Sequence, residues 1–592
     1  MSFFDDASLV FLPSGQAGKD GKAYSMKPTN GDGDFTFSRG SNLTATRVDS
    51  NGLIEKGREN LLLQSNQFDT TWRFYDVSVT SGQSGYDGST DAWLLDISGG
   101  TSGQRIEQSM SFGGIQTFSV YAKAGTLNWI RMRGSSNTYF DLANGVIGAD
   151  GHIDSKIESI GNGWYRCSVV TETSTLARIY LATDDGNVTQ SSGSIYIQDA
   201  QLEQGLVATE YIESGASTGK AGLLENEPRF NYPIGGGSPH LLLEPSRTNL
   251  IGQSEYIDNG SLITAITAIN NDTQSPEGLV NATRFRLGVD ESATRHRKLF
   301  VLSATSGQDY SFSVFFKEAD AQWVQLLAQT TNGVFDIQSY VNFDLQNGVK
   351  GNIGTSVVDS GIEDYGNGWY RCYMVATAQA TATGYLEILT TNNTDSGRYP
   401  SYENTTAINY CYVFGAQIEE GSYPTSYIPN HSGGSVTREA DVCGGAGTSS
   451  TFNDDEGVLY LEASAIDNGS SEKAIAINDG TTNNRINIRI VNNTIKGLVI
   501  LGGSLVCNIS YTATSVITSN KIAFKYKRDD FALWVNGVEV GTDTSGSTFT
   551  ADTLNELSFD YGGTSAFFYG NVEQVLYFPS ILTDTELATL TS

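Results

Sequence analysis

The heptapeptide Gly161-Asn-Gly-Trp-Tyr-Arg-Cys167 occurs a second time, unchanged, as Gly366-Asn-Gly-Trp-Tyr-Arg-Cys372. Four further blocks recur around it in the same order: Arg58–Ser65 as Arg247–Ser254, Phe118–Lys123 as Phe312–Lys317, Phe140–Val146 as Phe343–Val349, and Ala200–Gly205 as Ala416–Gly421. Blocks that repeat in a fixed order mark duplicated structural units. The chain therefore contains two copies of one module, near residues 58–215 and 247–430, and the wider spacing of the later blocks indicates insertions in surface loops of the second copy.

The repeated blocks have the pattern of half-buried strands. In Phe312-Ser-Val-Phe-Phe-Lys317 successive side chains point to opposite faces of a strand, and Asn144-Gly145 and Asn347-Gly348 supply the positive φ angles of tight hairpin turns. No long segment shows an apolar period of 3.6 residues. Each copy is therefore predicted to be a two-sheet antiparallel sandwich of about 150 residues.

The rest of the chain divides around these copies. Residues 455–592 alternate again, as in Phe531-Ala-Leu-Trp-Val535 before the Asn536-Gly537 turn, and predict a third sandwich. Residues 216–246 and the Gly- and Ser-rich residues 431–454 are predicted linkers. Residues 1–57 are too few for a core of their own, so this extended segment is expected to lie along the sandwiches or a neighbouring subunit. The predicted fold class is all-β, with tandem antiparallel sandwiches.

Charge excludes several classes of partner. The 592 residues carry 36 Lys+Arg against 66 Asp+Glu, a formal net charge of −30. Such a chain is repelled by nucleic acid and by anionic membranes, and no apolar stretch is long enough to span a bilayer. The start, Met1-Ser-Phe-Phe-Asp-Asp-Ala7, lacks the basic segment of a signal peptide, and the five cysteines show no CxxC spacing. We expect synthesis in a reducing cytoplasm.

The residues of a reaction centre are not recognisable. The four histidines, His152, His240, His296 and His431, have no second His or Cys at metal-ligand spacing, and no GxSxG, HExxH or phosphate-binding loop occurs. Paired carboxylates cannot be nominated among 66 acids, and the Asp-Asp pairs at 184–185, 454–455 and 529–530 are interpreted as solvated loops. We expect no enzyme activity, no catalytic residue and no metal site. No cofactor is expected either, although a structural calcium ion with oxygen ligands stays open.

Two parts of the chain resemble known sandwich families. The Asn60-Leu-Leu62 opening, the Phe118–Lys123 strand, the repeated heptapeptide and the closing Ala200–Gly205 strand together resemble carbohydrate-binding-module-like jelly rolls. Phe531-Ala-Leu-Trp-Val-Asn-Gly537 and the ending after Tyr577 resemble laminin-G/concanavalin-like sandwiches. Jelly rolls of the first family often hold one calcium ion near the first and last strands. Asp199 stands on the last strand of copy one, but copy two has Gly415 there, which argues against a calcium site in both copies.

The connecting segments carry a second resemblance. They are similar to a string found in structural proteins of tailed bacteriophages, in which the pieces normally run on without a break. In this chain the first sandwich separates Glu55 from Asn226 in that string. The matching segments are Phe35–Ser41, Ala45–Glu55, Asn226–Phe230, Leu241–Leu250 and Ser435–Asp441.

These resemblances imply a structural protein on the surface of a phage virion, made in the bacterial cytoplasm. It would be a head or tail fibre that contacts capsid, portal/neck or tail proteins through residues 1–57, adheres to host glycans, and forms a homo-oligomer, usually a trimer. One alternative is a purely structural capsid or neck decoration or connector. A polysaccharide-degrading tailspike is a third reading, disfavoured because such spikes usually show long parallel β-helix repeats.

The tryptophans supply the candidate ligand-binding residues. Trp164 and Trp369 recur, as do Trp129 and Trp323, and shared residues of a duplicated sandwich are expected in the core. Trp72, Trp93 and Trp534 have no matching Trp in the other copy, which makes them the candidates for stacking on a sugar. Ordinary core packing is the alternative interpretation for these three.

Overall fold

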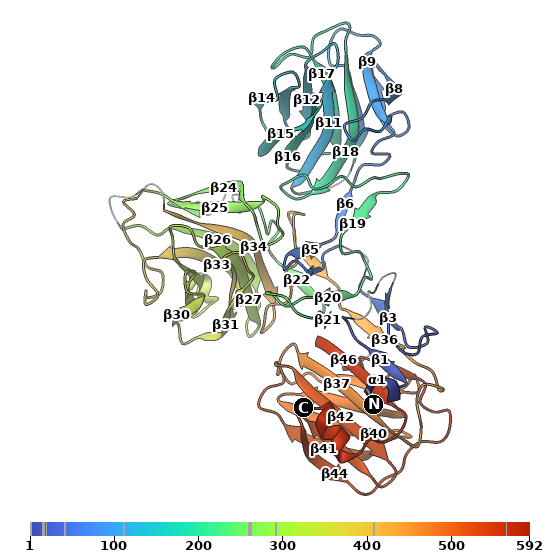
Figure 1. The fold of residues 1–592 in the computed structure, drawn as a ribbon. Coiled ribbons are helices and arrows are strands. Elements are labelled where there is room, and N and C mark those ends of the chain that lie inside the picture. The colour runs from blue at the N-terminus through green and yellow to red at the C-terminus, as the bar shows by residue number, and fades with distance from the viewer. Residues whose placement is uncertain are drawn as a thin grey trace.

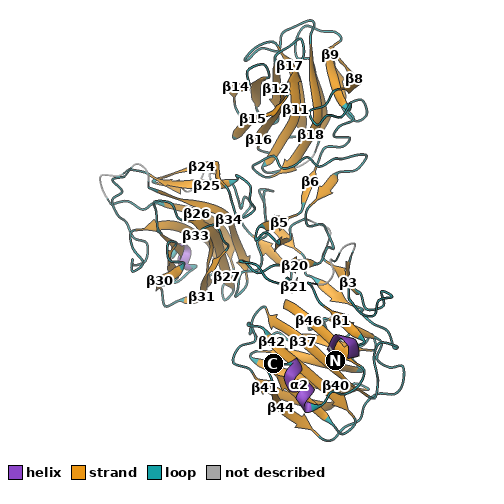
Figure 2. Cartoon of the chain, in the orientation of Figure 1, coloured by secondary structure: helices purple, strands orange, loops and turns teal. Residues whose placement is uncertain are grey.

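The structure, a computed structural model, describes residues 3–14, 18, 21–40, 43–110, 113–257, 263–289, 293–406, 409–563 and 565–592. Strands predominate there, and the helices of this described part are α1 (Phe3–Asp6), α2 (Asp584–Leu590) and one 3-10 turn, η1 (Thr331–Gly333) (Figure 2). Three sandwiches, named first, second and third in chain order, meet at a central junction (Figure 1). The predicted all-β fold of tandem antiparallel sandwiches is confirmed. Within the described ranges no helix has the length and apolar character to cross a membrane.

The first sandwich consists of two six-stranded antiparallel sheets, in the orders β15-β16-β11-β18-β9-β8 and β14-β13-β12-β17-β10-β7. Their strands are β7 (Arg73–Tyr75), β8 (Val77–Gln83), β9 (Ala92–Ile97), β10 (Arg105–Ser109), β11 (Gln116–Ala124), β12 (Trp129–Arg133), β13 (Asn137–Asp141), β14 (Val146–Asp150), β15 (Asp154–Gly161), β16 (Trp164–Thr171), β17 (Leu176–Ala182) and β18 (Ser194–Gln204). Alternate residues such as Val120, Ile130 and Ile179 fill the space between the sheets and are 0% exposed.

The second sandwich repeats this arrangement strand for strand, in the orders β31-β32-β27-β34-β25-β24 and β30-β29-β28-β33-β26-β23. Its strands are β23 (Ile263–Thr264), β24 (Ile266–Thr273), β25 (Ala282–Leu287), β26 (Arg297–Ala304), β27 (Asp309–Lys317), β28 (Trp323–Ala328), β29 (Tyr340–Asp344), β30 (Val349–Ile353), β31 (Val357–Asp364), β32 (Trp369–Thr377), β33 (Ala382–Thr391) and β34 (Tyr410–Glu420). The repeated sequence blocks thus produce one topology twice.

A shared bulge explains one difference between the copies. The register between β11 and β18 shifts between Ser119 and Tyr121, and the register between β27 and β34 shifts at the same place. Asp199 lies at the first bulge with a φ of 51°, and Gly415 lies at the second with a φ of 58°. Glycine adopts this left-handed conformation without cost, and aspartate is among the few other residues that tolerate it.

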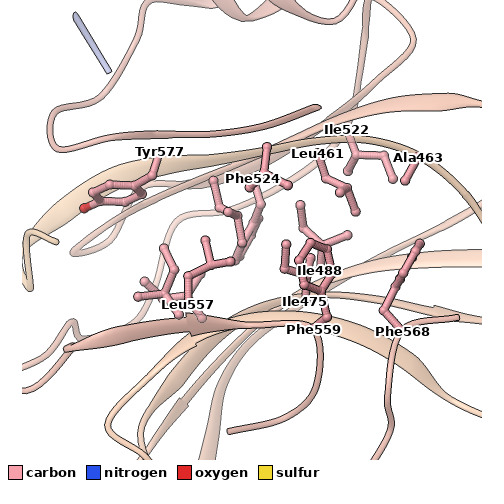
Figure 3. Close-up of a cluster of buried hydrophobic side chains, with 14 of the residues drawn as sticks. Leu461, Ala463, Ile475, Ile488, Ile522, Phe524, Leu557, Phe559, Phe568 and Tyr577 are labelled. Atoms are coloured by element: carbon pink, nitrogen blue, oxygen red, sulfur yellow. The ribbon is translucent and has the colours of Figure 1, made fainter. Parts of the chain in front are cut away.

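The third sandwich has a different topology. One sheet has the order β20-β21-β46-β37-β42-β43-β44, with β1 also paired to β46, and the other has the order β41-β40-β39-β38-β45. Its strands are β1 (Leu9–Phe11), β20 (Arg229–Asn231), β21 (His240–Leu243), β37 (Glu456–Ala465), β38 (Lys473–Asn478), β39 (Arg485–Val491), β40 (Thr494–Leu501), β41 (Ser504–Thr512), β42 (Asn520–Lys527), β43 (Phe531–Val535), β44 (Val538–Asp543), β45 (Glu556–Ser558) and β46 (Gly570–Phe578). Leu461, Ile488 and Phe524 pack between the two sheets (Figure 3).

The segments expected to be extended or linking contribute strands of their own. β1 and β20–β21 extend the third sandwich, so both chain ends lie there (Figure 1). Two of the remaining pairings are local, β2 (Lys22–Ala23) with β3 (Phe35–Ser38) and β4 (Thr46–Val48) with β5 (Ile54–Lys56). The others join segments far apart in sequence: β3 with β36 (Val442–Gly444), β6 (Arg58–Asn60) with β19 (Gly219–Ala221), and β22 (Arg247–Asn249) with β35 (Val436–Arg438). The chain runs from the junction into the first sandwich through β6 and returns through β19, and these two strands pair with each other. The domain limits drawn from the sequence stay predictions.

Buried ion pairs hold this junction together. Arg229 Nη1 lies 2.6 Å from Glu244 Oε2, Arg438 Nη1 lies 2.8 Å from the same oxygen, and Arg39 Nη1 lies 3.3 Å from Asp441 Oδ1. All five side chains are at most 3% exposed, and Arg229 also pairs with Asp441. Burial raises the pKa of Glu244, but Arg438 and Arg229 outweigh burial and hold that pKa below its ordinary value. Each of these buried charges is therefore compensated by the others, and loss of one would leave its partner buried without an opposite charge.

Candidate functional site

The outer face of one sheet in the first sandwich carries a row of aromatic and basic side chains. The register of β7, β10, β17, β12 and β13 places five residues directly opposite one another across the five strands. Ile130 and Met132 on β12 point into the core, so the alternate residues of this strand point outward. The row, named here the tyrosine–arginine row, consists of Tyr75, Arg105, Tyr180, Arg131 and Tyr139.

The arginines of the row lie over the tyrosine rings. The guanidinium carbon of Arg105 is 3.7 Å from the ring centroid of Tyr75, and that of Arg131 is 3.5 Å from the ring centroid of Tyr180. Stacking of this kind holds a guanidinium plane by cation–π attraction. Tyr180 is 4% exposed and Tyr139 is 7% exposed, so these two rings are covered, whereas Tyr75 at the end of the row is 38% exposed.

A second row beside the first adds further charge. Arg133 lies opposite Arg178, and Arg178 and Arg73 both lie opposite Glu107. Glu107 Oε2 accepts hydrogen bonds from Nε of Arg105 at 2.9 Å and from Nε of Arg178 at 3.1 Å. Burial raises the pKa of Glu107, but hydrogen bonds from Arg105 and Tyr75 outweigh burial and hold that pKa below its ordinary value.

Three arginines of this face have no ionic partner. In the part of the chain that the structure describes, no carboxylate oxygen lies within 4.0 Å of the charged nitrogens of Arg73, Arg131 or Arg133. The outward positions of these strands hold five arginines against the carboxylates of Glu107 and Asp141. In a chain with a net charge of −30, this face is a local basic exception.

The matching face of the second sandwich keeps one arginine of the row, because Arg297 lies opposite Leu389 as Arg105 lies opposite Tyr180. The other members of the row are replaced. Register places Leu389 where the first sandwich has Tyr180, Gln325 in place of Arg131, and Asn342 in place of Tyr139. The inserted segment after β33 covers that face, because the backbone N–H of Tyr399 donates to Gln325 Oε1 at 2.9 Å and Gln325 Nε2 donates to the carbonyl of Gly397 at 3.1 Å. Gln325 and Asn342 are 0% exposed. The duplicated face is therefore closed in one copy and open in the other.

The tryptophans nominated from sequence lie elsewhere. Trp72 is 4% exposed and Trp93 is 8% exposed, both pack in the core of the first sandwich, and their indole N–H groups donate to the carbonyls of Gln64 and Asn66. Trp534 is 7% exposed and packs in a cluster of the third sandwich. Their assignment to ligand binding stays a prediction, and it would require ring faces that this structure leaves covered.

The repeated tryptophans divide into two pairs. Trp164 and Trp369 are buried, as expected for residues shared by two sandwiches. The expectation of core positions for Trp129 and Trp323 is wrong, because both are half-buried on the outward side of β12 and β28. Strand alternation sends them away from the core, since Ile130 and Val324 point inward.

A cavity of about 500 Å³ lies beside the junction, lined by Lys56, Arg58, Glu203 and His431 among others. Its basic groups already have acidic partners. Lys56 Nζ is 2.7 Å from both Glu255 Oε1 and Glu277 Oε1. Burial lowers the pKa of Lys56, but the two carboxylates outweigh burial and raise it above its ordinary value.

The first sandwich has an acidic site without such a lysine. Asp199 Oδ2 accepts a hydrogen bond from the Tyr86 hydroxyl at 2.9 Å. Burial raises the pKa of Asp199 to about 6, against the hydrogen bond from Tyr86 and with the help of Asp91 and Asp87. Across the described residues, no set of three or more His, Cys, Asp or Glu side chains is arranged to hold a metal ion.

Comparison with known proteins gives fold likenesses. No protein-family model and no curated protein sequence matches the chain. Among solved structures, the CBM40 of Ruminococcus gnavus IT-sialidase bound to alpha2,3 sialyllactose is 17% identical, with a TM-score of 0.22, covering 25% of this chain and 88% of its own. The CBM22 tandem domain of Paenibacillus barcinonensis Xyn10C is 11% identical, with a TM-score of 0.19, covering 65% of this chain and 99% of its own. Domains LG4-5 of the mouse laminin alpha1 chain are 12% identical, with a TM-score of 0.18, covering 54% of this chain and 89% of their own. At these identities and TM-scores, none of the likenesses indicates what this chain binds.

Proposed function

We propose that this chain is a non-enzymatic surface protein of a tailed-phage virion, a head or tail fibre, which adheres to host glycans. The observation that supports adhesion is the tyrosine–arginine row, open on the first sandwich and closed on the second. Guanidinium groups held on tyrosine rings are preorganised hydrogen-bond donors, and donors that need no ordering lose less entropy when a ligand binds. The phage context rests on the resemblance of the connecting segments.

Adhesion by such a face would be weak for one copy. A sheet face without a deep cleft buries a small part of a saccharide, so useful strength would come from several copies acting together on one particle. A homotrimer, as the resemblance implies, would present three equivalent faces. Because β1 is part of the third sandwich, attachment through residues 1–57 would place the third sandwich nearest the capsid, portal/neck or tail proteins and the first sandwich away from them.

A purely structural connector is the second candidate. The buried ion pairs of Arg229, Arg438, Glu244 and Asp441 favour it, because they fix the segments that connect the second and third sandwiches, as would suit a spacer. The two candidates differ in where the first sandwich lies on the particle. A spacer would bury this sandwich among virion proteins, and an adhesin would expose it.

Two measurements test the proposal. A glycan array probed with the full chain should give binding that falls when Arg105 and Arg131 are both replaced by Gln, whereas Lys156→Gln on the opposite sheet should leave it unchanged. Electron microscopy of particles labelled with an antibody against the first sandwich should show it at the outer surface. If the array shows no bound glycan and the antibody labels only broken particles, the result would support the connector instead.

A further inference from the structure

Building on the proposed function, we infer that the saccharide held by the first sandwich is acidic, and that Arg131 and Arg133 bind its carboxylate or sulfate group. Both side chains leave the same face of β12, and the residue between them, Met132, points into the core. Neither has a carboxylate partner among the described residues. Two guanidinium groups on one strand face can hold one anionic group through paired hydrogen bonds.

Like charges in register point to a missing anion. Arg133 lies directly opposite Arg178 on the neighbouring strand, and like charges in that position destabilise a sheet. Arg178 is paired with Glu107 on its other side, but Arg133 has no such compensation among the described residues. An anionic group over β12 would offset the repulsion between Arg133 and Arg178.

The row also limits the kind of anion. Single-stranded nucleic acid is usually bound on aromatic side chains whose open faces stack with bases, but Tyr180 and Tyr139 are almost fully covered here. Nucleic acid carries a charge at every phosphate, so a chain of −30 repels it strongly. A saccharide with fewer charges is repelled less, and its hydroxyl groups can accept from the remaining guanidinium N–H groups. Five strands about 4.8 Å apart make the row about 19 Å long, enough for several sugar units.

The second sandwich supports the same inference by contrast. Gln325, Leu327 and Glu387 stand where the first sandwich has Arg131, Arg133 and Arg178. These three arginines therefore have no basic counterpart in the covered copy, where Arg297, the counterpart of Arg105, is paired with Glu387. The paired arginines of β12 are therefore a feature of the first sandwich and are not repeated at the matching positions of the second.

The test compares charged and neutral polymers with the same backbone. Calorimetric titration of the full chain would use lightly carboxymethylated dextran against dextran, and partly methyl-esterified polygalacturonate against its full methyl ester. We expect binding of at least one acidic polymer and none of its neutral counterpart. Arg131→Gln together with Arg133→Gln should weaken binding by about tenfold to a hundredfold, because each change removes charge-assisted hydrogen bonds. Lys156→Gln, which removes one positive charge from the opposite sheet, should leave binding unchanged.

A further variant separates geometry from charge. Arg131→Lys keeps the charge and loses the planar fork, so it should weaken binding of the acidic polymer severalfold. If Arg131→Lys and the unchanged chain bind equally well, the acidic polymer is held by nonspecific charge attraction alone, and the inference is overturned. Thermal unfolding of every variant should still show a cooperative transition of the folded protein, since these side chains lie outside the core.

Other outcomes separate this inference from the function on which it rests. Binding of neutral and acidic polymers alike, unaffected by the double variant, would overturn the acidic ligand and leave glycan adhesion standing. Glycan-array binding confined to neutral sugars would do the same. No binding to either polymer set or to the array would overturn both. Tighter binding of oligothymidylate than of any saccharide, or a change of oligomer mass in the double variant without any saccharide binding, would assign the face to another partner.

Discussion

Replacement of Asp199 by Asn is predicted to stabilise the first sandwich at pH 8 and to have little effect at pH 4. The carboxyl is 6% exposed, and burial raises its pKa to about 6 from an ordinary 3.8. At about 1.4 kcal/mol per pH unit, holding it ionised costs the folded state roughly 3 kcal/mol. The amide of asparagine keeps the shape and can accept the hydrogen bond from Tyr86, and asparagine tolerates the left-handed backbone at this bulge.

The direction of this pH dependence follows from how tightly each state binds the Asp199 proton. Because the folded state holds the Asp199 proton more tightly than the unfolded state, the stabilising contribution of this group is complete below about pH 4 and is lost as the pH rises through about 6. The amide in the Asp199→Asn variant does not titrate, so the variant escapes this loss. The gain at pH 8 should therefore be roughly 3 kcal/mol, equivalent to about 6–12 °C in the unfolding midpoint of a sandwich of this size.

The assay is urea unfolding at pH 4 and pH 8 in the presence of a chelator. Hydrogen exchange of peptides from β9 and β18 would assign the change to the first sandwich, which matters because a chain of several domains need not unfold in one step. Tyr86→Phe is the matched control. It removes a donor to the carboxylate, so it should destabilise at pH 8 and not at pH 4. Equal stabilisation by Asp199→Asn at both pH values, or destabilisation at pH 8, would refute the reasoning.

Three further predictions concern the junction and the buried tryptophans. Lys56→Met should destabilise the chain by about 3–5 kcal/mol in urea unfolding at pH 7, because Glu255 and Glu277 would be left as buried carboxylates without their cation, and a loss below about 1 kcal/mol would contradict it. The free energy of unfolding should fall as the pH drops below about 4.5, because the stabilisation gained from the lowered pKa of Glu244 is present above the unfolded pKa and lost as that group is protonated; constant stability from pH 7 to pH 3 would count against these ion pairs. Trp93→Ala should cost about 3–5 kcal/mol of stability, with glycan binding by the folded variant unchanged, whereas lost binding at unchanged stability would support its assignment as a ligand residue.

The topology of the first two sandwiches could be predicted from sequence because the repeats carry their own signal. Blocks such as Phe118–Lys123 and Phe312–Lys317 alternate as strands do, and their fixed order requires equivalent positions in both copies. The extra strands of the junction could not be predicted in this way. β6 and β19 are three residues each and pair across the whole first sandwich, so neither segment carries a pattern that names its partner.

The tyrosine–arginine row could not be fully predicted either, because its residues come together only through the register of five strands. Trp129-Ile-Arg-Met-Arg133 already shows that two arginines share one strand face, and this was the available signal. The tyrosines beside them come from other strands, and a shift of one residue in any strand would move them to the opposite face. Trp72 and Trp93 carry no comparable signal. Absence of a counterpart in the other copy says nothing about whether a ring points inward.

The most direct test of the account is chemical protection of arginines in the full chain. Phenylglyoxal labelling followed by peptide mass spectrometry would be performed with and without a saturating acidic polysaccharide, with Arg295 of the second sandwich as the internal reference. The account predicts protection of Arg131 and Arg133 and unchanged labelling of Arg295. Unchanged labelling of Arg131 and Arg133 beside protection on another sandwich would contradict the claim that this face of the first sandwich holds the ligand.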